Sequence, residues 1–326
     1  CDDASGLGDI AVVRLTAFGY TRVQILDGGI GAWEQAGYEI FSGVNVPSKA
    51  FGEFVEHKYG TPRLPAAEIK AKLDAGDNIV ILDSRPMKEF TTMSIPGGIC
   101  CPGAELAYRV SDAVEDPNAL VVVNCAGRTR SIIGAQSLIN AGIPNQVVAL
   151  ENGTMGWHLA GYGLDHGQVR HAPDVTEKGL ERSRKMADTV ANRFGVEKVS
   201  NAELERFRTQ TSEITLFVLD VRSPEEFVAG HLPGSRSAPG GQLVQATDEY
   251  VGVRNARLVL VDDTGVRSTM TASWLIQMGW DNVYVLEGGM TQSGLEVGPE
   301  QREVLGLGSL DVQLVEASVL NELITA

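Results

Sequence analysis

The sequence predicts an α/β fold of tandem domains, each with a parallel sheet flanked by helices. Two observations predict it. Runs of four or five Val, Ile and Leu alternate with helix-forming segments along the 326 residues, and such runs are typical of strands buried on both faces of a parallel sheet. The same order of segments also recurs at a domain-sized interval, which is too long for a solenoid repeat. Strands that alternate with helices give an α/β domain.

The first half of each unit is a strand followed by an acidic motif. The run Ile79–Leu82 leads into an Asp-x-Arg-x-x-x-Glu-Phe element that begins at Asp83. The run Leu216–Leu219 leads into the same element at Asp220, 137 residues later. A Pro-Gly turn follows each element, and the constant offset predicts two copies of one domain.

The second half of each unit is a strand, a loop, a helix that ends at Gly and another strand. We expect strands at 120–124, 147–150, 258–261 and 283–286, and a further one at Val23-Gln24-Ile25-Leu26, which resembles the last of them. In the helix after the loop of the second unit, Ile132, Ala135 and Ile139 share one face. Gly142 is the expected C-cap of that helix.

These comparisons divide the chain into five parts. We expect the C-terminal half of a domain at 1–45, a complete domain at 46–173, a helical linker at 174–197, a second complete domain at 198–305 and the start of a further unit at 306–326. The linker helix should begin after Asp174 as N-cap and end at Gly195. Since the chain begins at Cys1 inside an expected domain, we interpret it as a fragment or a processed product; a mature lipoprotein is the alternative.

Composition excludes several classes of partner. The net charge of −15 and the pI of about 4.8 argue against a nucleic acid or an anionic membrane. We find no apolar run of 18 residues and expect no transmembrane span. The four Cys form no C-x-x-C pair, so we expect no metal and no cofactor. We place the protein in a reducing compartment, the cytoplasm.

Cys125 is the candidate nucleophile. It follows the expected strand 120–124 and precedes a helix, so it lies at the carboxyl end of a parallel sheet, where ligands bind in α/β folds. Loop N–H groups, the helix N-terminus, Arg128 and Arg130 all favour negative charge on its sulfur. The expected anion-binding residues are Ala126, Gly127, Arg128, Thr129, Arg130 and Ser131.

The motifs together resemble one family. The loop Cys-Ala-Gly-Arg-Thr-Arg-Ser at Cys125, the element at Asp83, the turn Ile95-Pro96-Gly97 and the segment Glu-Asn-Gly-x-x-Gly-Trp that ends at Trp157 resemble the rhodanese family of thiosulfate sulfurtransferases. The resemblance covers almost the whole chain and implies tandem rhodanese-like domains. It implies that Cys125 takes sulfur from a small anionic donor such as thiosulfate. The resulting persulfide then passes sulfur to a thiol, cyanide or protein acceptor.

Two alternatives are open. Cell-cycle dual-specificity phosphatases share this fold but use Cys-x5-Arg, whereas Cys125 to Arg130 is Cys-x4-Arg and Asn124 stands where their His would be. In the other alternative, Cys125 belongs to a sulfur carrier or a binding module for a protein partner that does not turn over.

The remaining units depart from the active pattern. Asp262 occupies the place of Cys125 in the later domain, and Asp2 does so in the first fragment. A carboxylate cannot form a persulfide, so both sites are expected to be inactive. Cys1 lies one position before Asp2, and its acidic neighbours disfavour a thiolate.

Several residues beside the candidate site have a structural interpretation and a functional one. Arg85 and Trp157 are candidates for the pocket wall. The structural alternatives are an ion pair between Arg85 and Glu89, four residues apart, and core packing for Trp157. Cys100 and Cys101 are expected on a short strand beside the site, as structural residues or as a sulfur relay.

Overall fold

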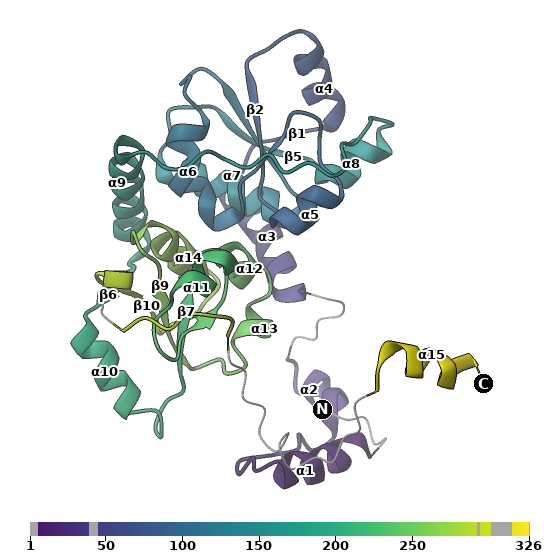
Figure 1. Ribbon diagram of the computed structural model, residues 1–326, viewed down its shortest axis with the longest axis vertical. Helices are drawn as coiled ribbons and strands as arrows, with labels where there is room; N and C mark the ends of the chain where they lie inside the picture. Colours follow the sequence, from purple (N-terminus) through teal and green to yellow (C-terminus); the bar gives the residue numbers. More distant parts are fainter. Residues whose placement is uncertain (1–5, 39–44, 292–293, 301–314, 326) are drawn as a thin grey trace. The chain divides into compact units, whose positions relative to one another are not determined.

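The computed structural model describes residues 6–38, 45–291, 294–300 and 315–325. They fall into two compact units, one within residues 43–300 and the other formed by the two ends of the chain. None of the described helices is both long enough and apolar enough to cross a bilayer. The larger unit contains two parallel sheets (Figure 1).

The first sheet has five strands in the order β1-β5-β4-β2-β3, and its strand pairings are all parallel. The strands are β1 (Arg63–Leu64), β2 (Ile79–Asp83), β3 (Ile99–Cys100), β4 (Leu120–Asn124) and β5 (Val147–Leu150). The helices around it are α3 (Val46–Tyr59), α4 (Ala66–Asp74), α5 (Met87–Thr92), η1 (Gly103–Glu105), α6 (Leu106–Ala113), α7 (Thr129–Ala141) and α8 (Gly153–Leu159).

The second sheet repeats this topology, in the order β6-β10-β9-β7-β8, again with parallel pairings. Its strands are β6 (Glu197–Val199), β7 (Leu216–Asp220), β8 (Arg236–Ser237), β9 (Arg257–Val261) and β10 (Val283–Leu286). The helices are α9 (Glu177–Phe194), α10 (Asn201–Thr209), α11 (Pro224–Ala229), α12 (Gly240–Gln245), α13 (Thr247–Tyr250), α14 (Val266–Gln277) and η2 (Gly289–Thr291). The predicted tandem α/β fold is confirmed.

The interior positions of the central strands are apolar because helices cover both faces of each sheet. Val121 and Val123 of β4 pack into one core cluster, while Val122 between them packs into the cluster on the opposite face. Successive side chains of a strand point to opposite faces, so a strand with two buried faces needs an unbroken apolar run.

Helix α7 is buried more widely than its sequence pattern predicts. Ile132 and Ala135 are buried as expected, but Ile139 is 37% exposed and Leu138 takes its place in the core. The three residues share one side of the helix, but α7 packs against α3 and α6 as well as the sheet, which shifts and widens its buried face away from Ile139. Gly142 is confirmed as the C-cap, with φ of 76°.

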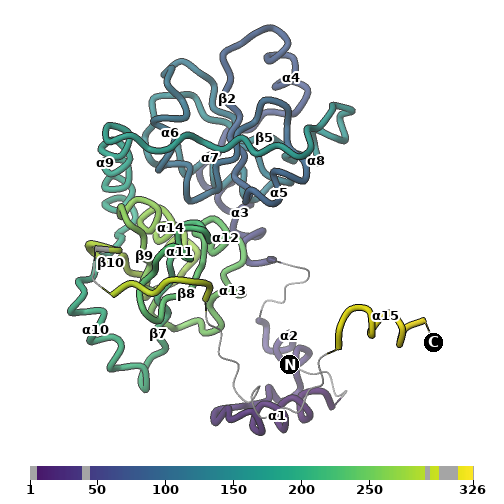
Figure 2. Tube along the Cα trace, in the orientation of Figure 1, coloured from purple at the N-terminus to yellow at the C-terminus, as the bar shows by residue number. Residues whose placement is uncertain are grey.

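Helix α9 connects the two domains, as the trace in Figure 2 shows. It ends at Gly195 as predicted, with φ of 67°. The expected N-cap Asp174 is wrong. Thr176 caps the helix instead, because its Oγ1 accepts a 3.0 Å hydrogen bond from the N–H of Gly179, the standard geometry of a Thr N-cap.

The smaller unit holds α1 (Leu7–Ala17), α2 (Gly29–Gln35) and α15 (Ala317–Thr325). The segment 23–26, expected as a strand, is irregular, and Ile25 is 44% exposed. A strand needs a neighbour for its backbone groups, and the described part of this unit contains no other strand. Cys1 and Asp2 lie outside the described residues.

Candidate active site

Cys125 lies in the loop between β4 and α7, at the carboxyl end of the first sheet. Its side chain is 2% exposed. The Sγ lies 3.6 Å from the Oγ of Ser131, which itself donates a 2.7 Å hydrogen bond to the carbonyl oxygen of Arg128. The Ser131 hydroxyl is therefore within reach of the sulfur and can rotate toward a sulfur anion.

The backbone N–H groups of the loop are available to a ligand. Within the described residues, nothing accepts a hydrogen bond from the N–H groups of Ala126, Gly127 or Arg128. Those of Thr129, Arg130 and Ser131 belong to the first turn of α7, where no intrahelical acceptor exists. The loop thus presents unpaired donors next to Cys125, together with the positive end of the helix.

The start of α8 forms two backbone hydrogen bonds to this loop. The N–H of Thr154 donates to the carbonyl oxygen of Cys125 at 2.7 Å, and that of Met155 donates to Ala126 at 3.0 Å. Gly153 has φ of +54°, and a Cβ there would clash with the Cys125 carbonyl and lie 2.7 Å from the oxygen of Gly127. Only glycine allows this approach, which explains why Gly stands at position 153.

A buried polar network supports the ends of β2 and β4. Arg85 forms a two-point ion pair with Asp83, with N–O distances of 2.6 and 2.8 Å. The Asn124 amide donates to Asp83 at 2.9 Å and to Thr154 at 3.1 Å. The expected pair between Arg85 and Glu89 is wrong: Arg85 precedes helix α5, so the helical spacing of four does not bring the two side chains together.

Glu89 instead pairs with Arg130, through two N–O contacts of 2.7 Å. Burial alone would raise the pKa of Glu89, but the hydrogen bonds and charge of Arg130 lower it overall. The Nη1 of Arg130 also contacts Oε1 of Gln242 at 3.5 Å, a residue of the second domain.

Arg128 is held by helix α3. Its Nε and Nη2 donate to the carboxylate of Glu53 at 2.6 and 3.0 Å, and Nη2 also donates to Glu56. Hydrogen bonding to Glu53 raises the pKa of Arg128. Both loop arginines therefore carry carboxylate partners in this structure.

The corresponding loop of the second domain holds a buried carboxyl group of its own. Asp262 is 1% exposed, and its two carboxylate oxygens accept hydrogen bonds from the N–H groups of Gly265 and Arg267 at 2.9 and 3.1 Å. The hydroxyls of Ser268 and Thr264 donate as well, at 2.7 and 3.0 Å. Burial raises the pKa of this carboxyl, while Arg267 and Ser268 oppose that effect.

Arg267 corresponds to Arg130 and has more carboxylate partners. It pairs with Glu226 of its own domain at 2.7 Å, with Asp263 at 2.7 Å and with Glu105 of the first domain at 2.8 Å. Glu105 occupies the repeat position of Gln242. The two loops are thus each contacted by the opposite domain, one by a carboxylate and the other by an amide.

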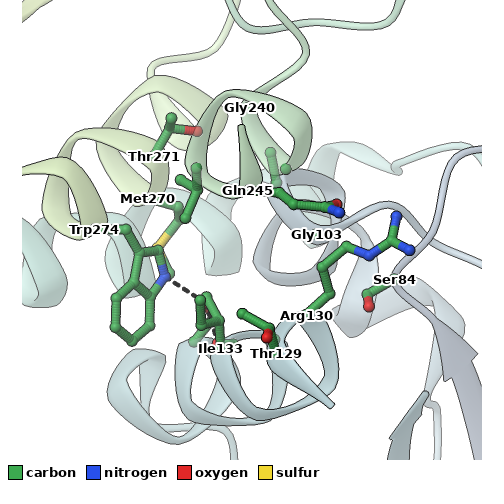
Figure 3. A pocket seen from close by; sticks show the side chains of 15 residues that line it. Ser84, Gly103, Thr129, Arg130, Ile133, Gly240, Gln245, Met270, Thr271 and Trp274 are labelled. Carbon is green, nitrogen blue, oxygen red and sulfur yellow. Dashed lines mark hydrogen bonds between the residues drawn. The ribbon is translucent and has the colours of Figure 1, made fainter. Parts of the chain in front are cut away.

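A cavity of about 30 Å³ lies between the two domains, large enough for water. Figure 3 shows Thr129 and Arg130 of α7 on one side, and Gln245 and Thr271 of the second domain on the other. The Nε1 of Trp274 donates a 2.7 Å hydrogen bond to Ser137 here.

Arg85 and Trp157 do not line this cavity. Trp157 is 2% exposed, packs in the core below α8 and donates to the carbonyl of Gly163 at 3.0 Å. Cys100 lies on β3 as predicted, and Cys101 follows it. Burial raises the pKa of Cys100 to about 12 and holds that of Cys101 well above its usual range, so both stay thiols near neutral pH.

The structure reveals contributors that sequence reasoning missed. Glu53, Glu56 and Gln242 reach the loop from 75, 72 and 112 residues away in the chain, and no local motif marks them. The repeat offers one signal, because Gln242 stands where the first domain has Glu105. In the described residues, no group of three His, Cys, Asp or Glu is arranged to hold a metal ion.

Comparison with known families matches the rhodanese-like domain to residues 65–160 and 200–293. A solved structure of a thiosulfate sulfurtransferase from Pseudomonas aeruginosa is 51% identical, with a TM-score of 0.92, and the match covers 100% of this chain and 61% of that one.

Curated relatives match over shorter stretches. An HTH-type transcriptional regulator of Mycobacterium tuberculosis is 31% identical over 110 residues, which are 33% of this chain and 47% of the regulator. The thiosulfate sulfurtransferase GlpE of Pseudomonas aeruginosa is 36% identical over 75 residues, 22% of this chain and 64% of the relative. In each of these matches, less than two thirds of the other protein is covered.

Proposed function

Because the chain belongs to the family of rhodanese-like domains, we propose that it is a sulfurtransferase that carries sulfane sulfur on Cys125. The donor is a small anion, thiosulfate in the first place, and the acceptor is a thiol, cyanide or the thiol of a partner protein. The observation that carries the proposal is the loop at Cys125, in which N–H groups without a protein acceptor directly follow a cysteine at the carboxyl end of the sheet.

The chemistry is a double displacement. The Cys125 thiolate attacks the outer sulfur of thiosulfate, an S–S bond forms, and the original S–S bond breaks with its electron pair leaving on sulfite. The enzyme now holds a persulfide. Cyanide then attacks the outer sulfur, thiocyanate leaves, and the electron pair of the broken S–S bond restores the thiolate.

The second domain supports the anion-binding role of this loop. The terminal atom of a persulfide lies two bonds beyond Cβ, as a carboxylate oxygen of aspartate does. Asp262 places such oxygens on the N–H groups of Gly265 and Arg267. Their counterparts are those of Arg128 and Arg130, so we assign these two groups to the outer sulfur of the persulfide.

We assign the side chains of the loop as follows. Arg128 and Arg130 bind the anionic donor, Ser131 orients the sulfur, and Ala126, Gly127 and Thr129 contribute backbone donors. Arg85 and Trp157 are buried and support the site from below. Asp262 takes no sulfur because a carboxylate is no nucleophile for a sulfane group. The free thiols Cys100, Cys101 and Cys125 fit a reducing compartment, the cytoplasm.

The test is the intact mass of the full chain after incubation with thiosulfate, for the wild type and for Cys125→Ser. We expect the wild type to gain about 32 Da, one sulfur atom, and to lose it on treatment with cyanide, as a covalent intermediate must. The variant should gain nothing. No gain in the wild type would refute thiosulfate as donor, and loading without release to cyanide would indicate a carrier that awaits a protein acceptor.

A further inference from the structure

We propose that Glu53 and Glu56 of α3 compete with the anionic sulfur donor for Arg128, and so set the affinity of the active site for that donor. The inference rests on the proposed function, because it takes Arg128 as a residue that binds the donor. It adds two carboxylates, outside the region matched by the family, that decide how readily an anion enters.

The contacts of Arg128 carry the first step. Its Nε and Nη2 are engaged by Glu53 in a two-point ion pair, and Nη2 is shared with Glu56. Paired N–H bonds to a carboxylate are the geometry that a guanidinium also uses for an oxyanion. A donor such as thiosulfate that binds Nε and Nη2 in the same two-point geometry must displace at least one carboxylate.

The position of α3 makes this competition a fixed property of the site. A Cβ on Gly52 would lie 2.9 Å from Cγ2 of Thr129, so the helix sits directly on the start of α7. Glu56 is anchored by Arg63 at 2.6 Å, and Phe51 packs edge-on against Trp274 with ring centroids 6.0 Å apart. These contacts hold the backbone of α3 against α7, so the two carboxylates are positioned to pair with Arg128.

The second domain has neither an arginine at the position of Arg128 nor carboxylates that pair with such an arginine in its described residues. Helix α9 packs on α14 as α3 packs on α7, but Gly265 stands in the place of Arg128. Carboxylates of α9 pair with lysines instead, at 2.7 Å between Glu181 and Lys185. The two carboxylates of α3 therefore occur in the domain whose loop carries the arginine that would bind the donor.

The strength of the pair predicts the size of the effect. The side chain of Glu53 is 58% exposed and that of Arg128 is 32% exposed, so water and salt weaken their attraction. A dianion can therefore displace Glu53. Removing its charge should lower the KM for thiosulfate about two- to fivefold, the range of an exposed ion pair, with kcat nearly unchanged.

The experiment measures thiosulfate:cyanide turnover of the full chain at about 0.15 M salt, which screens charges beyond about 8 Å. It compares wild type, Glu53→Gln, Arg128→Met and the double variant. Glu181→Gln is the matched control, since it removes the same charge from the corresponding helix of the second domain. We expect the control to keep the wild-type KM, and Glu53→Gln to lose its effect once Arg128 is replaced.

The outcomes separate this inference from the proposed function. A higher or unchanged KM in Glu53→Gln would overturn it, because the carboxylate would then position Arg128 or be irrelevant to the donor. An equal fall in the Arg128→Met background would overturn it too, because a general field and not competition would act. If wild-type Cys125 takes up no sulfur from thiosulfate, the proposed function itself fails.

Discussion

The clash predicted at Gly153 gives a direct test of how the active loop is held. Replacing Gly153 by Ala forces a non-glycine residue into a left-handed conformation, at about 1–2 kcal/mol. The new Cβ also pushes on the carbonyl oxygens of Cys125 and Gly127. The two hydrogen bonds from Thr154 and Met155 to the loop should then weaken, at about 1 kcal/mol each.

The full chain should therefore lose about 3–4 kcal/mol of unfolding free energy in urea, and sulfur loading on Cys125 should slow. Gly142→Ala is the matched control, since Gly142 has φ of +76° but open space around its Cβ. It should lose only about 1–2 kcal/mol and load sulfur normally. Equal losses in both variants would show that the α8 turn does not press on the loop, and would refute this reasoning.

Two further predictions concern Arg130 and Arg267, the corresponding arginines that each contact a residue of the other domain. Gln242 contacts Arg130 at 3.5 Å, so Gln242→Glu places a second carboxylate beside Arg130, as Glu105 pairs with Arg267 at 2.8 Å. This should raise the KM for thiosulfate about fivefold; an unchanged KM in steady-state assays would contradict this. Glu226 has its pKa lowered from 4.5 to about 2 because Arg267 outweighs the effect of burial. The ionised carboxylate therefore stabilises the folded state above about pH 4.5, and this stabilisation is lost as the pH falls toward 2. Arg267→Met should be less stable at pH 7 and lose less stability over that interval in urea unfolding; parallel curves for variant and wild type would argue against this.

Local signals in the sequence predicted the sheet and the loop well. The apolar runs at β2, β4, β7 and β9 and the helix stop at Gly142 depend on neighbouring residues alone, so their pattern sufficed. The candidate nucleophile could be placed for the same reason, since Cys125 directly follows a strand.

Contacts between distant segments could not be predicted. Arg128 pairs with Glu53 and Glu56 because α3 packs against α7. No spacing in the sequence predicts that contact. The mistaken pair of Arg85 and Glu89 came from applying helical spacing across Pro86, where the helix has not yet begun. The prediction of a strand at Val23–Leu26 is wrong, because the residue pattern carries no information about the neighbouring strand that its backbone groups need.

The bond from Trp274 to Ser137 has a consequence for how the two domains recognise each other. These residues are 137 apart, the repeat interval, so they occupy the same position in the two copies and mark a pseudo-two-fold axis. In a dimer of identical subunits, a side chain on that axis must meet its own copy. Two tryptophans would overfill the space and two serines would leave a void. Fusion into one chain frees the two positions to differ, and the large-and-small pair then favours the union of unlike domains over pairing of either with itself.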